Sequence, residues 1–193
     1  MEDISVANDS PAESSYAIKF INPPAVVDLL DLEAGIVVAD FGCGSGYFSL
    51  PIAKKIGENG VVYALDILPH SLETVESQAK TAGITNIITK RVNLEKQGGS
   101  KLPDESCDWV IMKDMLFQNK DKGVILAEAG RVLKEKGRIL VIEWNSAADS
   151  SIGPDMSLRI SKESLTEIIQ KSGLGVLKEI PISNFHYGLI LIK

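Results

Sequence analysis

The sequence is poor in the residues that bind metals or form disulfides. Its 193 residues include two cysteines, Cys43 and Cys107, and two histidines. No pair of these residues has the spacing of a zinc site, and two cysteines do not make a disulfide framework. Cys43 is therefore predicted to be a small buried side chain in a reducing compartment, and no metal site is predicted.

The chain also lacks an excess of positive charge and any long hydrophobic run. Its 20 Lys and Arg residues stand against 26 Asp and Glu residues, which gives a net charge of −6. No basic stripe is present, so no nucleic-acid partner is expected. The apolar runs are too short to cross a bilayer, and the acidic residues 1–10 do not fit a signal peptide. We therefore expect a cytoplasmic protein with a small-molecule partner and no membrane contact.

Residues 1–15 differ in composition from the rest of the chain. They are rich in Ser, Asp, Asn and Glu, which predicts a disordered or loosely attached segment. Residues 16–193 have the length and composition of one globular domain, so a single domain is predicted there.

Strand and helix patterns alternate through this predicted domain, after a short helix that Pro24 begins. This alternation predicts an α/β fold, a mostly parallel sheet with helices on both faces. Only PISNF separates the last two strands, so they are expected to pair antiparallel. Strands are predicted at residues 36–41, 61–66, 86–92, 107–113, 138–144, 174–180 and 186–192, and helices at 47–57, 71–83, 124–137 and 161–173.

Three glycines follow the first predicted strand at alternate positions. They are Gly42, Gly44 and Gly46 in the segment ADFGCGSGYF. Glycines after a parallel strand let the backbone turn sharply and approach a ligand at the carboxyl edge of the sheet. A dinucleotide fingerprint needs G-x-G-x-x-G, but Tyr47 stands at the third position. The pattern is instead D-x-G-x-G-x-G, which begins at Asp40.

This pattern resembles the first motif of the class I S-adenosylmethionine-dependent methyltransferases. LPDESCDWV and GRVLKEKGRILVIEW resemble segments around strands four and five of the small single-domain members related to the UbiE/quinone-biosynthesis and arsenite methyltransferases. The resemblance covers residues 23–193. It implies a Rossmann-like, seven-stranded sheet of order 3-2-1-4-5-7-6 with the last strand antiparallel. It also implies methyl transfer to a small-molecule acceptor, with S-adenosyl-L-methionine as cofactor and S-adenosyl-L-homocysteine as product.

The resemblance also implies which residues contact the cofactor. The methionine end would lie over the glycines, and Asp66 at the end of the second strand would hold the ribose. Ile67 would pack on the adenine, and the side-chain oxygen of Asn93 would accept a hydrogen bond from the adenine amino group. The family often has an acidic residue at the position of Asn93. Lys113 would face the methionine through its backbone carbonyl. The full implied set is Asp40, Gly42, Gly44, Gly46, Asp66, Ile67, Asn93, Leu94 and Lys113.

The catalytic residues do not follow from the resemblance. A thiolate, carboxylate or amine acceptor needs little help, whereas a hydroxyl group or an acidic carbon needs a base. Asp114, Glu143 and His186 lie at the ends of predicted strands and are the candidates for such a base. Each also fits a structural role, so the acceptor and its nucleophilic atom stay open.

Three alternatives to a methyltransferase remain at this point. A protein that binds the cofactor without catalysis would show affinity but no turnover. An NAD-type oxidoreductase is disfavoured by the glycine spacing and by the antiparallel strands at the end. A fold relative that makes polyamines would need acidic residues after the fourth strand, where Asp114 stands alone.

Overall fold

The computed structural model describes residues 20–148 and 151–193, so the predicted loose segment 1–15 lies outside the described residues. Besides the short 3-10 turns η1 (Leu116–Gln118) and η2 (Met156–Leu158), it contains helices and strands in alternation. In chain order these are α1 (Pro23–Asp28), β1 (Val37–Phe41), α2 (Ser49–Ile56), β2 (Val61–Asp66), α3 (Pro69–Thr81), β3 (Ile87–Arg91), β4 (Cys107–Lys113), α4 (Lys122–Val132), β5 (Leu133–Trp144), α5 (Lys162–Lys171), β6 (Gly175–Pro181) and β7 (His186–Ile192).

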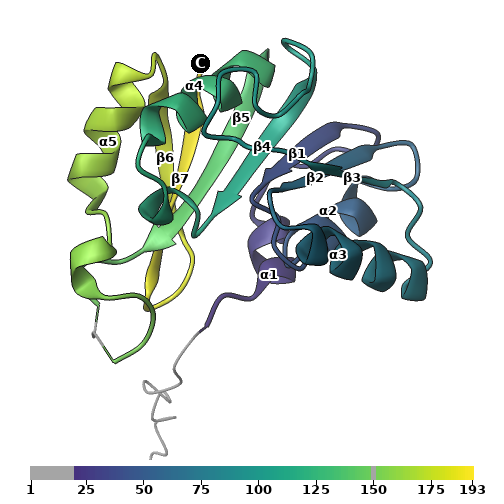
Figure 1. Ribbon diagram of the computed structural model, residues 1–193, viewed down its shortest axis with the longest axis horizontal. Helices are drawn as coiled ribbons and strands as arrows, with labels where there is room; N and C mark the ends of the chain where they lie inside the picture. Colours follow the sequence, from purple (N-terminus) through teal and green to yellow (C-terminus); the bar gives the residue numbers. More distant parts are fainter. Residues whose placement is uncertain (1–19, 149–150) are drawn as a thin grey trace, which may run out of the picture.

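The strands form one seven-stranded sheet of order β3-β2-β1-β4-β5-β7-β6. The pairs from β3 to β5 are parallel, whereas β7 runs antiparallel to both of its neighbours, β5 and β6. Helices α4 and α5 cover one face of the sheet, and α1, α2 and α3 cover the other (Figure 1). The predicted fold class and strand order are confirmed.

The alternation of side chains along β1 shows why both faces are covered. Val38 points to one face and packs in a buried cluster with Val27 of α1 and Ile52 of α2. Phe41 points to the other face and packs in the cluster that contains Ile125 of α4. Because both faces of the strand are buried, its sequence is apolar throughout, as parallel sheets require.

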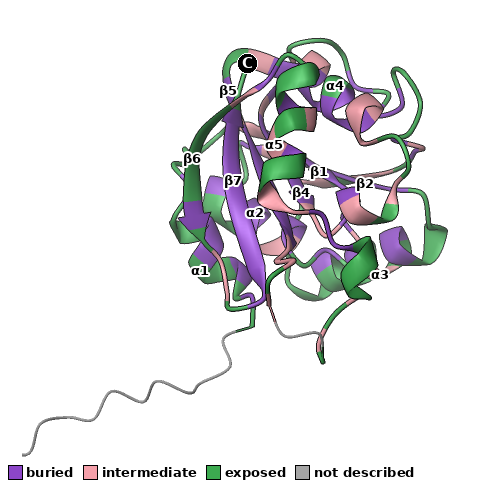
Figure 2. Cartoon of the chain, turned by 90° about the vertical axis from the view of Figure 1, so that its left-hand side faces the viewer, coloured by how far each residue is buried: buried purple, intermediate pink, exposed green. Residues whose placement is uncertain are grey.

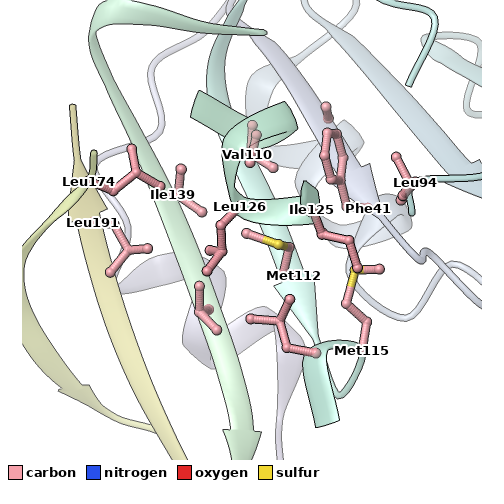
Figure 3. Close-up of a cluster of buried hydrophobic side chains, with 14 of the residues drawn as sticks. Phe41, Leu94, Val110, Met112, Met115, Ile125, Leu126, Ile139, Leu174 and Leu191 are labelled. Carbon is pink, nitrogen blue, oxygen red and sulfur yellow. The ribbon is translucent and has the colours of Figure 1, made fainter. Parts of the chain in front are cut away.

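Figure 3 shows part of the buried cluster between the sheet and α4. Met112 of β4 lies beside Leu126 of α4, and Met115, just after β4, extends the cluster toward Leu94 in the loop after β3. The apolar packing thus extends up to the carboxyl edge of the sheet, where loops follow β1, β2 and β4. Figure 2 shows that β7 is buried, whereas β6 at the sheet edge is largely exposed.

Helix boundaries follow local chemistry in most places. α2 ends at Ile56, and Gly57 follows it with a φ of 71°, in the region that favours glycine. Ser161 caps α5, because its hydroxyl accepts the N–H of Ser164 at 3.2 Å. α3 begins at Pro69, two residues before the start of the helix predicted at 71–83, since proline suits the first position of a helix.

The predicted helix at 124–137 is too long. α4 ends at Val132, and β5 begins with the next residue, Leu133. The carbonyl of Val132 accepts the N–H of Ser106 at 2.9 Å, and Leu133 pairs with Cys107 of β4. Pairing with β4 draws these residues into the sheet, so tertiary contacts override a sequence with good helix propensity.

None of the helices in the described part of the chain is long and apolar enough to span a membrane.

Candidate active site

A cavity of about 660 Å³ lies at the carboxyl edge of the parallel strands. Its walls come from the loops after β1, β2, β3 and β4, together with the end of β5 and the start of β7. This is the place where open α/β sheets bind ligands, and the volume is in the range of small-molecule sites. β7 reaches this edge with its first residue because it runs antiparallel to β5.

The glycine loop forms one wall of the cavity. Gly42, Gly44 and Gly46 have φ values of 71°, 51° and 84°, a region that side chains other than glycine seldom adopt. Gly42 and Gly44 line the cavity, and a Cβ added at Gly44 would meet no atom within 4 Å. The backbone at Gly44 is therefore bare on the cavity side and open to close approach by a ligand.

Gly46 differs from Gly42 and Gly44 in its surroundings. It does not line this cavity, and a Cβ there would lie 3.1 Å from Val75 of α3. Its implied contact with the cofactor stays a prediction, whereas its close packing against α3 is visible in the structure.

Asp66 connects the glycine loop to the end of β2. Its Oδ2 accepts the N–H of Gly44 at 2.9 Å, and its Oδ1 accepts the N–H of Leu68 at 2.9 Å. A carboxylate has about four acceptor positions, so each oxygen keeps one for a ligand. Asp66 lines the cavity with both oxygens held at fixed places, which suits a pair of neighbouring hydroxyl groups such as those of a ribose.

A second polar group lies at the opposite side of the cavity. Asp114 follows β4, and its carboxylate forms an ion pair with Lys113. Oδ1 of Asp114 also lies 3.3 Å from Nε2 of His186, the first residue of β7. All three side chains line the cavity, so Lys113 does contribute a wall of the site. Its ammonium also lies 5.6 Å from the ring centroid of Tyr47.

Comparison with known proteins identifies the family. Residues 32–173 match the family described as "Methyltransferase domain", which is well over half of the chain. The chain belongs to this family. An aklanonic acid methyltransferase of Streptomyces sp. (strain C5) is 31% identical over 124 residues, which are 63% of this chain and 55% of that protein.

Two further relatives agree with this assignment. A ubiquinone/menaquinone biosynthesis C-methyltransferase of Haemophilus ducreyi is 29% identical over 133 residues, 68% of this chain and 50% of that protein. The chain thus spans about half the length of these curated relatives. The structure of a SAM dependent methyltransferase from Aquifex aeolicus superposes with a TM-score of 0.81 at 23% identity and covers 90% of each chain.

These findings confirm the resemblance to the class I S-adenosylmethionine-dependent methyltransferases as membership of a methyltransferase family, and S-adenosylmethionine is the cofactor that this family implies. The geometry fits such a cofactor at two points. Gly44 is open to approach, and Asp66 keeps free acceptor positions beside it. The positions of the individual residues can now be compared with the cofactor contacts that the resemblance implied.

Ile67, Asn93 and Leu94 all line the cavity near Asp66. Ile67 is half exposed, so it offers an apolar surface beside the carboxylate of Asp66. Oδ1 of Asn93 accepts the N–H of Glu95 at 3.0 Å, which fixes the side chain and leaves one acceptor position open. The adenine contacts that the resemblance implies for these residues stay a prediction.

Asp40 does not line the cavity, although the motif begins with it. Its side chain is buried below the glycine loop and accepts a hydrogen bond from Ser49 Oγ at 2.5 Å. Burial raises the pKa of Asp40 to about 6, against the opposing effect of Ser49. The structure thus gives Asp40 a role in joining β1 to the first turn of α2, while a direct cofactor contact stays a prediction.

Glu143 likewise lies away from the cavity, so the structure does not support it as the base. It is fully buried, and its Oε1 accepts the N–H of Leu116 at 2.7 Å. Burial, with a smaller contribution from the charge of Asp114, raises the pKa of Glu143 to about 8. Of the candidates for a base, Asp114 and His186 are the ones that the structure brings together at the cavity.

Aromatic side chains complete the wall next to these two residues, and the sequence analysis did not assign them there. Trp144, the last residue of β5, lies with its ring centroid 4.0 Å from that of His186. Phe20 and Tyr47 also line the cavity, and Tyr47 is anchored by a hydrogen bond to the carbonyl of Ile21 at 2.8 Å. Alternation along β5 could have indicated that Glu143 and Trp144 point in opposite directions.

Arg159 holds the loop behind Trp144 rather than facing the cavity. It is buried, its guanidinium donates to the carbonyls of Asn145 at 3.1 Å and Pro154 at 3.1 Å, and it lies over the Trp144 ring.

Within residues 20–148 and 151–193, no group of three or more His, Cys, Asp or Glu side chains is arranged to hold a metal ion. Burial raises the pKa of both free thiols, Cys43 and Cys107.

Proposed function

We propose that this chain transfers a methyl group from S-adenosylmethionine to a small-molecule acceptor. The observation that carries the proposal is the contact of Asp66 with the open glycine loop. The carboxylate and the bare backbone at Gly44 lie side by side on one wall of a cavity large enough for a ligand. Family membership adds the identity of the cofactor.

Different residues would contact different parts of the cofactor. Asp66 would accept hydrogen bonds from the ribose hydroxyl groups, and Ile67 and Asn93 would contact the adenine. Gly42 and Gly44 would let the methionine end lie against the backbone. When bound, S-adenosylmethionine supplies a methyl carbon made electrophilic by the attached sulfonium. The chain itself supplies orientation, which is the main requirement of an in-line transfer from an activated donor.

The acceptor side of the cavity is formed by Asp114, His186 and Trp144. The proposal places the acceptor there because the cofactor contacts lie at the opposite end, above β1 to β3. A cytoplasmic location, the absence of a nucleic-acid partner and the assignment to EC 2.1.1.- belong to this proposal too. They rest on composition and family.

A thermal-shift titration tests the cofactor. At a hundredfold excess over its dissociation constant, a ligand adds about 2.7 kcal/mol, a shift of roughly 5–10 °C for a chain of this size. We expect S-adenosylmethionine and S-adenosylhomocysteine to stabilise the wild type, and NAD to have no effect. Asp66→Ala should lose the shift, and the exposed control Asp31→Ala should keep it. Stabilisation by NAD alone would contradict the proposal.

Catalysis needs a separate test, because a binding protein would give the same thermal shifts. The assay follows formation of S-adenosylhomocysteine from S-adenosylmethionine with a panel of phenols, thiols, amines and carboxylic acids. Turnover with any acceptor, abolished in Asp66→Ala, supports the enzyme. Tight cofactor binding without turnover on every class would favour the alternative of a protein that binds the cofactor without catalysis.

A further inference from the structure

Asp114 has an unusual backbone conformation for a residue with a side chain. Its φ is 52°, in the left-handed region, which Asp and Asn adopt more readily than other residues. Its N–H still donates to the carbonyl of Ile142 at 2.9 Å, so the turn begins directly where the pairing of β4 with β5 ends. A strained residue at the edge of a ligand cavity points to a function for the side chain that it orients.

The carboxylate of Asp114 is only partly satisfied. Oδ2 accepts a hydrogen bond from Lys113. Oδ1 is buried and faces Nε2 of His186 at 3.3 Å, yet neither atom makes a well-aligned hydrogen bond. Buried polar atoms normally have partners, so the hydrogen bonds of these two facing atoms are incomplete.

The contacts of His186 decide which of the two residues can accept a proton. Ser183 Oγ accepts the N–H of Phe185 at 3.2 Å and lies 3.1 Å from Nδ1 of His186. In the tautomer in which Ser183 donates to Nδ1, the imidazole proton lies on Nε2, toward Asp114. In that tautomer the lone pair of His186 is engaged with Ser183, and the carboxylate of Asp114 is the proton acceptor at the cavity.

The surroundings of Asp114 indicate the shape of the acceptor. Trp144 stands against His186, and Tyr47 and Met115 line the same cavity, with Phe20 at its wall. The side chains of Phe20 and Tyr47 are 63% and 48% exposed, which leaves aromatic surface open to a ligand. Aromatic rings of this kind pack well against a flat, apolar molecule.

We propose that Asp114 is a catalytic residue that accepts the proton of an aromatic hydroxyl group, so that the acceptor of this site is a phenol. His186 and Lys113 are positioning residues that hold the carboxylate from two sides. This inference rests on the proposed methyl transfer and specifies its substrate class.

The step balances as follows. The phenol O–H proton moves to a carboxylate oxygen of Asp114, while an oxygen lone pair forms the new C–O bond to the methyl carbon. The bond from that carbon to sulfur breaks, and its electron pair stays on sulfur. Products are the aryl methyl ether, S-adenosylhomocysteine and the protonated Asp114, which then loses its proton to solvent.

Asp114→Asn is the variant that tests the proposal. Asn keeps the size of the side chain and tolerates the left-handed backbone, but its amide cannot accept a proton. Asp121→Asn is the matched control, because Asp121 caps α4 away from the cavity and Asn is an equally good cap. Both variants should bind S-adenosylhomocysteine as the wild type does, which shows that the fold and the cofactor site are intact.

The activity test compares two acceptors of one shape, 2-naphthol and 2-naphthalenethiol. The thiol ionises by itself near neutral pH and needs no base, whereas the hydroxyl group does. A positioned base contributes roughly 10²–10⁴-fold, so Asp114→Asn should lower kcat for 2-naphthol at least a hundredfold. Transfer to the thiol should change less than threefold. Equal losses with both acceptors, or an unchanged rate with 2-naphthol, would overturn the proposal.

A binding measurement gives a second readout that does not depend on turnover. In the presence of S-adenosylhomocysteine, the wild type should bind 2-naphthol at least tenfold more tightly than its methyl ether, 2-methoxynaphthalene. Asp114→Asn should remove most of that preference. Failure of the wild type to bind 2-naphthol overturns the phenol proposal, even where cofactor binding and transfer to thiols show that the proposed methyl transfer is correct.

The ratio of the rates with 2-naphthol and 2-naphthalenethiol also tests the positioning role of His186. His186→Gln should lower kcat for 2-naphthol about tenfold and leave the transfer to 2-naphthalenethiol unchanged. A merely structural histidine would alter both reactions alike.

Discussion

Glu143 accepts a hydrogen bond from the backbone N–H of Leu116 at 2.7 Å, at a place that solvent does not reach. The contact ties the end of β5 to the short turn that follows Asp114. The second carboxyl oxygen of Glu143, Oε2, has no hydrogen-bond partner among the described residues. Burial keeps this carboxyl protonated at neutral pH, because its pKa is raised to about 8.

Glu143→Gln should therefore change how stability depends on pH. The folded state binds the proton of Glu143 more tightly than the unfolded state, so this residue favours folding below about pH 4.5. That contribution is lost as the pH rises from there through about 8. Relative to the Gln variant, the wild type should lose up to about 4 kcal/mol between pH 5 and 8.5, at about 1.4 kcal/mol per unit. Urea unfolding at both pH values measures the difference. Parallel changes in the two proteins would contradict the assignment.

Gly44→Ala should separate backbone strain from cofactor binding. Gly83 is the matched control, because it has a similar left-handed φ of 66° against 51° and an equally open Cβ position, but lies outside the cavity. Both alanine variants should lose roughly 1–2 kcal/mol of stability, the cost of a left-handed alanine. Only Gly44→Ala should also weaken S-adenosylhomocysteine binding, by tenfold or more, as isothermal titration would show. Equal affinities in the two variants would remove Gly44 from the cofactor site.

Glu128 of α4 fixes the loop before β4. It is buried and accepts hydrogen bonds from Arg131 at 2.7 Å and from the N–H of Ser100 at 3.0 Å. Glu128→Ala leaves these donors unpaired, so we expect a loss of about 3 kcal/mol and a fall in Tm of roughly 6–12 °C. The exposed Glu135→Ala should stay within about 0.5 kcal/mol of the wild type. Comparable melting curves for the two variants would count against this network.

Gly153→Ala should disturb the wall of the cavity from behind. Gly153 has a φ of 90°, and an added Cβ would lie 2.4 Å from the ring of Trp144. The ring would have to move, and with it the stacking on His186. We expect a lower Tm and a shifted tryptophan emission maximum, while S-adenosylhomocysteine affinity stays within threefold. An unchanged emission spectrum would mean that the ring keeps its position.

Most strands could be located from the sequence because they are separate apolar runs, whereas their order in the sheet was implied by the resemblance to the methyltransferases. The end of α4 did not follow, since the polar residues after Leu133 suit a helix as well as a strand. Lys134 pairs with Asp108 at 2.9 Å across the sheet, and a bulge takes up the extra residues. A contact between residues so far apart along the chain leaves no local pattern.

The residues of the candidate site also fall into those that the sequence could predict and those that it could not. Asp66 and Gly44 follow from motif spacing, and the structure places both at the cavity. The difference between Asp114 and Glu143 could not be derived, because an acid at a strand end can point to solvent, into the cavity or into the core. That choice depends on the twist of the sheet and on which helix covers the next strand. His186 reaches the site only because β7 is antiparallel to β5.

The reversed direction of β7 also places its last residues far from its first. His186 lies at the cavity, whereas Lys193 donates to the carbonyl of Leu133 at 2.8 Å, beside the amino end of β5 (Figure 1). A fluorophore or a surface tether attached at Lys193 would therefore stand at the opposite edge of the sheet. Immobilised through that position, the protein presents its open cavity to the solution, which makes it suited to sensor formats that must admit a ligand freely.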